Sequence, residues 1–114
     1  MNPEIKKMWV EALRSGEYKQ TTGALRQLDM DSALPCYCCL GVLCDLAVKA
    51  GVTNPFYENH TACLPTSVYK WAGLDTPDPE VPLGSDKIGT PLTRLNDELR
   101  MDFKTIADHI EASL

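Results

Sequence analysis

Four of the five cysteines in the chain lie in one short apolar segment, PCYCCLGVLCDLA, at residues 35–47. These are Cys36, Cys38, Cys39 and Cys44. Because the number of cysteines is odd and we expect a reducing, cytoplasmic environment, a disulfide framework is not expected. The simplest interpretation is that most of these thiols are small core side chains, since free cysteine is among the residues most often buried.

Zinc binding is a second interpretation of the cysteines. Cys36 and Cys38 form a C-x-C pair, and His60 and Cys63 form an H-x-x-C pair. Zinc prefers thiolate and imidazole ligands, but structural sites normally space their cysteine pairs as C-x(2–4)-C. The first pair is tighter than that spacing. We therefore expect no bound metal or other cofactor, and a zinc-stabilised interaction module with these four ligands is kept as an alternative.

Nucleophilic catalysis is a third interpretation. A helix is predicted to begin near Cys38, and the N-terminus of a helix lowers the pKa of a thiol placed there. Cys38 or Cys39 would then be the nucleophile. His60 would be the base, and Asp97 or Asn96 would orient it. A small cysteine-dependent hydrolase or transferase is therefore an alternative function, although no P-loop, G-x-G-x-x-G, H-E-x-x-H or G-x-S-x-G motif is present.

Basic and aromatic side chains outside the cysteine segment suggest a site for a small anion. Arginine binds phosphate and carboxylate groups with a planar fork, and tyrosine rings stack on flat ligands. The alternative is that these residues form a solvated basic face and half-buried aromatic contacts. The candidate ligand-binding residues are Arg26, Arg94, Asn96, Asp97, Tyr18 and Tyr37.

The composition limits the classes of partner. The chain has 114 residues, a net charge of −5 and a pI of about 4.9, with its basic residues scattered. Binding along a DNA or RNA polymer needs clustered Lys and Arg, so it is not expected. No apolar run approaches the roughly 20 residues of a membrane span, and the N-terminal segment is amphipathic rather than like a signal peptide. We expect a cytoplasmic protein without a membrane partner.

The clearest predicted helix lies at residues 3–14. Asn2 suits the N-cap and Pro3 suits the first helical position. Gly16 is a suitable left-handed residue after its end. Apolar residues recur at the spacing of one buried helical stripe, namely Ile5, Met8, Trp9, Ala12 and Leu13.

Four further helices are predicted, at residues 38–50, 65–72, 90–96 and from 103 onward, the last capped by Asp102. The helix at 38–50 carries only two charges, Asp45 and Lys49, so we expect it to be buried. The remaining segments are predicted as one or two short strands between Tyr18 and Leu28, a short strand at 61–64 and an extended surface loop at 75–91.

These elements predict one domain that spans residues 1–114. We expect an α+β fold that is mainly α-helical, with the cysteine-containing helix buried at its centre and a small β element beside it. The expected core residues are Trp9, Leu13, Leu40, Leu43, Leu46, Trp71, Leu95, Phe103 and Ile106.

Four blocks of the sequence resemble a family of small uncharacterised proteins of tailed phages and prophages, namely MNPEIKKMWVEALRSGEYKQ, YCCLGVLCDLAVKAG, LPTSVYKWAGL and LTRLNDELRMDFKTIADHIE. The most characteristic parts are YCCLGVLCDL at residues 37–46 and the LND…F..IAD.IE pattern at residues 95–111. The resemblance extends over most of the chain and fails at residues 52–62 and in the proline-rich loop. The family pattern includes the cysteines at 38, 39 and 44. It does not clearly include Cys36, His60 or Cys63, which disfavours the zinc quartet. The resemblance implies no specific activity.

The expected function is that of a small phage-type binding protein without catalytic activity. It would act in the host cytoplasm by sequestering a small anionic ligand, such as a nucleotide signal, or by inhibiting a host protein. A homo-oligomer is compatible with this function.

Overall fold

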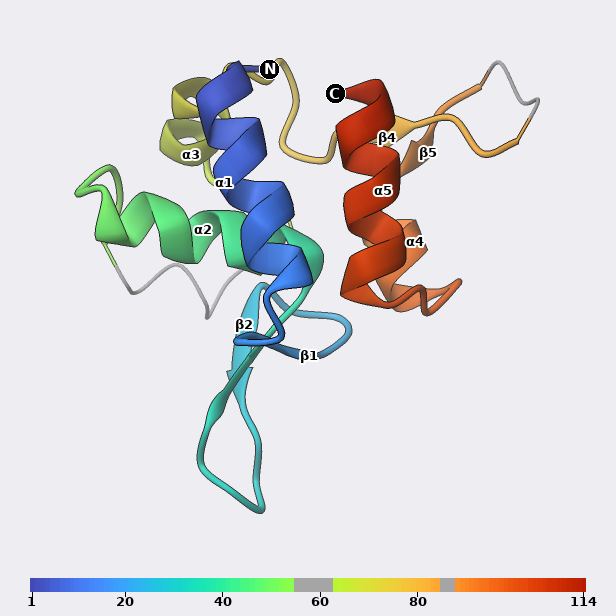
Figure 1. Ribbon diagram of the computed structural model, residues 1–114. Helices are drawn as coiled ribbons and strands as arrows, with labels where there is room; N and C mark the ends of the chain where they lie inside the picture. Colours follow the sequence, from blue (N-terminus) through green and yellow to red (C-terminus); the bar gives the residue numbers. More distant parts are fainter. Residues whose placement is uncertain (55–62, 85–87) are drawn as a thin grey trace.

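Groups of short strands separate the helices along the chain (Figure 1). The structure is a computed structural model that describes residues 1–54, 63–84 and 88–114. Its helices are α1 (Pro3–Arg14), α2 (Cys39–Lys49), α3 (Thr66–Trp71), α4 (Leu92–Asp97) and α5 (Phe103–Ser113). Its strands are β1 (Lys19–Gln20), β2 (Arg26–Leu28), β3 (Pro35–Tyr37), β4 (Glu80–Val81) and β5 (Thr90–Pro91). They form one compact α+β unit with a radius of gyration of 13.1 Å, a value expected of a single domain of this length.

Helix α1 begins and ends where the sequence predicts. The Asn2 side chain accepts hydrogen bonds from the backbone N–H groups of Glu4 and Ile5, at 2.9 and 3.2 Å. These bonds satisfy two donors that the first helical turn cannot satisfy internally. Gly16 follows the helix with a φ of +78°, the left-handed conformation that glycine adopts without strain.

The predicted β element is a three-stranded sheet with strand order β1-β3-β2. The strands β1 and β2 fall inside the predicted range of residues 18–28, but β3 was not predicted. Strand β3 pairs parallel to β1 and antiparallel to β2. Pro35 stands at its first position, where the absence of an N–H group is tolerated. This proline, and the cysteines that follow it, made the sequence resemble a loop that leads into a helix.

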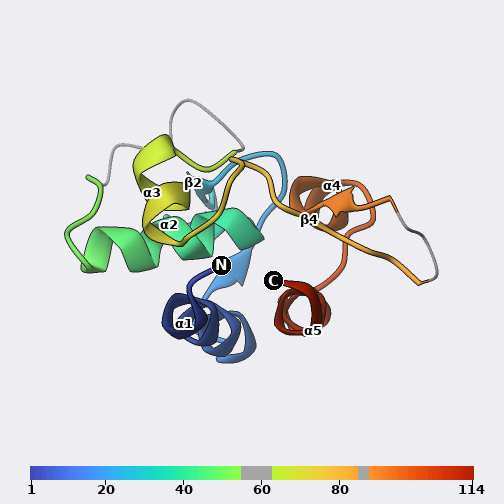
Figure 2. The same ribbon diagram turned by 90° about the horizontal axis from the view of Figure 1, so that it is seen from above.

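Helices α1 and α5 lie side by side in both views (Figures 1 and 2). Arg14, at the end of α1, forms ion pairs with Asp108 and Glu111 of α5, at 2.6 and 3.0 Å. Helix α2 contacts α1, α3 and α4. Trp9 donates a buried hydrogen bond from Nε1 to the backbone oxygen of Cys39 at 2.9 Å, which joins α1 to the start of α2.

Most of the predicted core is buried, with two exceptions. Leu46 and Trp71 are only half-buried, because each lies toward the outer side of its helix. In α1, Met8 is 44% exposed, and Val10 takes its place in the core. Core residues that the sequence analysis did not name include Leu25, Val68, Val81, Leu92 and Ile110.

The proline-rich segment at 75–91 contains more structure than the predicted surface loop. Strands β4 and β5 pair antiparallel, with Val81 opposite Thr90. Val81 is fully buried, and β4 contacts α5. The strand predicted at 61–64 lies partly outside the described residues, and Leu64 is buried without belonging to a strand. Within the described residues, no helix is both long enough and apolar enough to cross a membrane.

Candidate functional site

The four cysteines of residues 35–47 are buried, with exposed fractions between 0 and 5%. The five cysteines, all within the described residues, form no disulfide, and Cys63 is half-buried. Burial raises the pKa of Cys39 and of Cys44 well above the ordinary value, because a thiolate loses its hydration there. These positions fit the interpretation of the thiols as core side chains.

Cys38 is the N-cap of α2, so the helix end acts on it as predicted, but burial has the larger effect. Its Sγ accepts a hydrogen bond from the N–H of Gly41 at 3.4 Å, which favours the thiolate. Burial nevertheless raises the pKa of the Cys38 thiol to about 11, and the nearby Asp97 carboxylate adds to that rise. At neutral pH the thiol is therefore protonated. His60, the base of the alternative catalytic triad, lies outside the described residues.

The alternative zinc ligands are not assembled in the part of the chain that can be described. Among residues 1–54, 63–84 and 88–114, no group of three or more His, Cys, Asp or Glu side chains could hold a metal ion. Cys36, Cys38 and Cys63 are all within these ranges, whereas His60 is not.

Asn96 is fully buried and uses its whole side-chain amide inside the protein. Its Oδ1 accepts hydrogen bonds from Gln20 Nε2 at 2.8 Å and from the N–H of Cys39 at 3.2 Å. Its Nδ2 donates to the backbone oxygen of Thr21 and to Asp97 Oδ1, both at 2.8 Å. An amide has two donors and one oxygen with two lone pairs, so none remains for a ligand. Asn96 joins α4 to β1 and to the start of α2.

The other predicted polar ligand residues lie on two elements, Arg94 and Asp97 on α4 and Arg26 on β2. Arg94 is on the exposed side of α4, where its Nε pairs with Glu98 at 3.2 Å. Arg26 is in β2, in register with Tyr37 of β3. Asp97 is half-buried at the end of α4, with its Oδ1 held by Asn96.

The two predicted tyrosines do meet. Tyr18 and Tyr37 have ring centroids 5.1 Å apart and an interplanar angle of 82°, an edge-to-face contact. They share a pocket of about 460 Å³, which we call the tyrosine pocket. It is lined by Glu17, Tyr18, Lys19, Leu34, Pro35, Tyr37, Asp45 and Lys49.

Helix α2 supplies the charged side of the tyrosine pocket. Tyr18 donates a hydrogen bond from its hydroxyl to Asp45 Oδ2 at 2.5 Å, and Lys49 donates to that hydroxyl at 3.3 Å. Lys49 Nζ lies 3.2 Å from Asp45 Oδ2 and 5.6 Å from the centroid of the Tyr18 ring. Partial burial and the bond to Asp45 raise the pKa of Tyr18 to about 12, so its hydroxyl remains a donor at neutral pH.

A second ammonium group lies at the β side of the tyrosine pocket. Lys19 Nζ pairs with Asp29 at 2.6 Å, and its side chain is 59% exposed. The Lys49 side chain is 67% exposed, so both ammonium groups also face solvent. The hydrogen bond and ion pair to Asp29 raise the pKa of Lys19, while the hydrogen bonds to Tyr18 and Asp45 raise that of Lys49. Both groups are therefore cationic at neutral pH.

Two residues of the tyrosine pocket, Asp45 and Lys49, were not among the predicted ligand-binding residues, although the sequence marks them. Asp45 and Lys49 are the only charges of the otherwise apolar α2, and they are four residues apart, so they lie on one face of the helix. Because charged side chains are rarely buried, this pair indicates the face on which the otherwise apolar α2 reaches the surface. Which side chains they would meet there depended on β3, which was not predicted.

A family model described as "Domain of unknown function (DUF8296)" matches residues 1–114. The chain belongs to this family. No curated protein and no solved structure matched the chain.

Proposed function

We propose that this protein is a non-catalytic binding protein of phage or prophage type, and that it holds a small anionic ligand in the tyrosine pocket. The observation that carries the proposal is the meeting of Tyr18 and Tyr37 with the ammonium groups of Lys19 and Lys49 around one pocket. These four residues come from two strand-forming segments and a helix, and the fold alone brings them together.

The ligand class follows from the chemistry of the lining. Tyrosine rings with Leu34 and Pro35 offer flat and apolar surface, which suits a base or another aromatic ring. An ammonium group has three N–H donors. Within the described residues Lys49 uses two of its donors, toward Asp45 and Tyr18, and Lys19 uses one, toward Asp29. The remaining donors can bind a phosphate or carboxylate, so the pocket suits a nucleotide-like molecule.

The state of the thiols favours binding over catalysis. A nucleophilic cysteine needs a lowered pKa and access to substrate. Cys38 and Cys39 are buried, and the pKa of each is raised. The cytoplasm of a host cell is the proposed location, since these free thiols suit a reducing compartment.

Helix α2 would hold the pocket in shape. It supplies Asp45 and Lys49 while its other faces pack against α1, α3 and α4. We regard this cysteine-containing helix as the centre of a mainly α-helical domain. A rigid wall of this kind lowers the entropy lost when a ligand is bound.

Isothermal titration calorimetry with the 5′ mono- and diphosphates of adenosine, guanosine, cytidine and uridine tests the proposal. We expect at least one of them to bind, and Lys49→Gln to weaken that binding at least about tenfold, the cost of one charge-assisted hydrogen bond. Tyr18→Leu should weaken it as well, through loss of the ring. Lys104→Gln, on the exposed side of α5, removes the same charge outside the tyrosine pocket and is the matched control.

Two results would contradict the proposal. One is the absence of binding for all eight nucleotides at millimolar concentration. The other is binding that Lys49→Gln and Lys104→Gln weaken equally, because that would indicate a general effect of net charge. Thermal unfolding of each variant, followed by circular dichroism, establishes that the fold is intact, as expected for substitutions of exposed lysines.

A further inference from the structure

The connection between β2 and β3 carries an unusual amount of exposed apolar surface. Leu28 is 58% exposed, Met30 is 99% exposed and Leu34 is 60% exposed. These three lie within seven residues, at the end of the hairpin that extends away from the helices (Figure 1). We call residues 28–34 the hairpin tip. Single exposed apolar residues are ordinary, but a cluster of three at one projecting point is typical of a contact site.

The hairpin tip is ordered by its own hydrogen bonds. The backbone N–H of Asp29 donates to the backbone oxygen of Leu34 at 2.9 Å, and the backbone oxygen of Asp29 accepts from the N–H of Ala33 at 2.8 Å. Its side chain accepts from the N–H of Asp31 at 3.2 Å and from the hydroxyl of Ser32 at 3.0 Å. A turn that is already ordered loses little entropy when it binds, so the apolar side chains are presented in a fixed arrangement.

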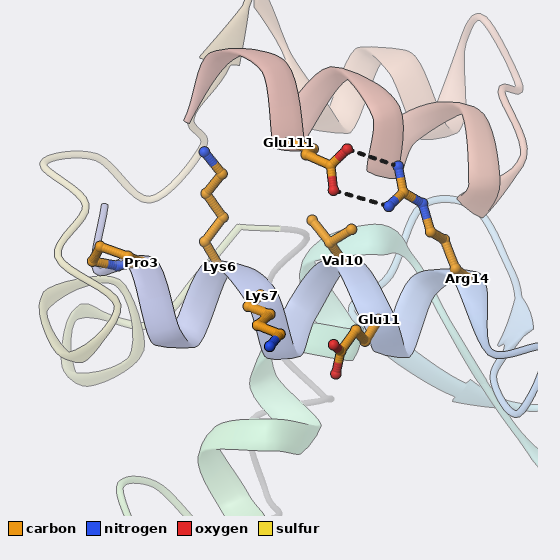
Figure 3. A pocket seen from close by; sticks show the side chains of 7 residues that line it. All are labelled: Pro3, Lys6, Lys7, Val10, Glu11, Arg14 and Glu111. Carbon is orange, nitrogen blue, oxygen red and sulfur yellow. Dashed lines mark hydrogen bonds and ion pairs between the residues drawn. The ribbon is translucent and has the colours of Figure 1, made fainter.

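A groove with complementary properties lies along α1. Its volume is about 300 Å³, and it is lined by Pro3, Lys6, Lys7, Val10, Glu11, Arg14 and Glu111. Lys6 extends from α1 toward α5, and Arg14 and Glu111 close the other end with their paired side chains (Figure 3). We call it the α1 groove. Pro3 and Val10 supply its apolar surface, and the Lys6 ammonium group points into it toward α5. Lys7 lies on the other side of α1, near the Glu11 carboxylate (Figure 3).

We propose that the hairpin tip of one copy of this chain docks into the α1 groove of a second copy. Met30 would contact the apolar surface of Pro3 and Val10, and the Asp31 carboxylate would face Lys6, with Lys7 adding positive charge at the outer edge of the groove. Within the described residues, Asp31, Lys6 and Lys7 have no ion-pair partner. Opposite charges that are otherwise unpaired on two surfaces fix their mutual orientation and speed their encounter.

The contact must form between copies rather than within one. The hairpin tip points away from the helices (Figure 1), so it cannot reach the α1 groove of its own chain. The two surfaces differ, so the contact is heterologous and produces a ring or an open chain of copies. Three apolar side chains bury less area than a standard interface, so the association is weak and depends on concentration.

Sedimentation velocity of the full chain tests this proposal. We expect the weight-average sedimentation coefficient to rise across the range from about 10 μM to 1 mM, as it does for weak association. Met30→Asp, which alters the hairpin tip, and the double variant Lys6→Glu/Lys7→Glu, which alters the α1 groove, should each remain monomeric over this range. Met30 and Lys7 are exposed and Lys6 is half-buried, and circular dichroism of both variants tests whether they fold as the natural chain does.

Mixing the two variants provides the decisive observation. The Met30→Asp chain keeps an intact groove, and the Lys6→Glu/Lys7→Glu chain keeps an intact tip, so a mixture should form a complex of one copy of each and grow no further. A natural chain that stays monomeric up to 1 mM would overturn the proposal. So would self-association of the Lys6→Glu/Lys7→Glu chain alone, because that would place the contact between two hairpin tips. Neither result decides whether the tyrosine pocket binds a nucleotide, and Met30, the tip residue that is varied, does not line that pocket.

Discussion

At the scale of single residues, the fully buried Asn96 side chain makes four hydrogen bonds. Its buried amide bonds to Gln20, to the N–H of Cys39, to the backbone oxygen of Thr21 and to Asp97. Substitution by alanine would leave several of these groups buried without a partner, and each such group costs about 1–3 kcal/mol. We expect Asn96→Ala to lower the free energy of unfolding by about 3 kcal/mol or more.

Urea denaturation measures this effect, with Asn2→Ala as the matched control. Asn2 also accepts two hydrogen bonds, but it is an exposed helix cap whose loss costs about 1 kcal/mol. Equal losses of stability in the two variants would contradict the structural role assigned to Asn96. From the sequence alone, Asn96 is a ligand-binding candidate, because an Asn-Asp pair near a helix end gives no sign of which side chain turns into the core.

At the scale of elements, α2 approaches another segment closely at Gly41. A Cβ atom built on Gly41 would lie 1.7 Å from the backbone oxygen of Leu25, which leads into β2. Alanine normally stabilises a helix interior relative to glycine by about 1 kcal/mol. At Gly41 we expect alanine to destabilise the protein instead, because neither the helix nor the backbone at Leu25 can move without disturbing the core. We expect Gly41→Ala to abolish cooperative folding.

Circular dichroism and thermal unfolding test the Gly41→Ala variant, with Gly16→Ala as the control. Gly16 has open space around it and a positive φ of +78°, so alanine there introduces backbone strain of about 1 kcal/mol and no clash. A Gly41→Ala protein with a melting temperature equal to that of the natural chain would show that α2 and Leu25 do not approach this closely.

Elements with a local sequence signal were predictable, and those defined by distant partners were not. Asn2, Pro3 and Gly16 mark α1 by side-chain chemistry that acts within one helical turn. Strand β3 is only three residues long, and its stability comes from pairing with β1 and β2 on both sides. Strands β4 and β5 are shorter still. Such short strands carry no periodicity that a single sequence can reveal.

At the scale of the whole molecule, the tyrosine pocket also could not be predicted from the sequence, because it too depends on residues that are distant along the chain. The sequence indicated Tyr18 and Tyr37 as candidates for stacking, but it gave no means to place them beside Asp45 and Lys49. Their meeting depends on the parallel pairing of β1 with β3 and on the direction in which α2 leaves β3. The sequence therefore predicted which tyrosine side chains could bind a ligand, whereas only the tertiary fold shows which residues surround them.

Burial of the thiols also predicts how stability of the whole molecule depends on pH. Folding raises the pKa of Cys38 to about 11, whereas an unfolded thiol loses its proton near pH 8.5–9. Above pH 9 the unfolded chain therefore releases a proton that the folded chain retains, and the free energy of unfolding falls as the pH rises toward 11. Cys39 and Cys44 act in the same direction. Below about pH 8 the thiols are protonated in both the folded and the unfolded chain, so they do not make the free energy of unfolding depend on pH.

The variant Cys38→Ser isolates one part of this alkaline loss. A serine hydroxyl can cap α2 by accepting from the N–H of Gly41, and it does not ionise in this range. Each pH unit between the unfolded and the folded pKa lowers the free energy of unfolding by about 1.4 kcal/mol. In reducing buffer, urea denaturation from pH 7 to 10.5 should therefore show a decline that is smaller by about 2 kcal/mol for Cys38→Ser than for the natural chain. Cys63→Ser, which removes a half-buried thiol, should follow the natural curve more closely. Identical alkaline slopes for the natural chain and Cys38→Ser would mean that water reaches Cys38, and the thiol would again be a candidate nucleophile.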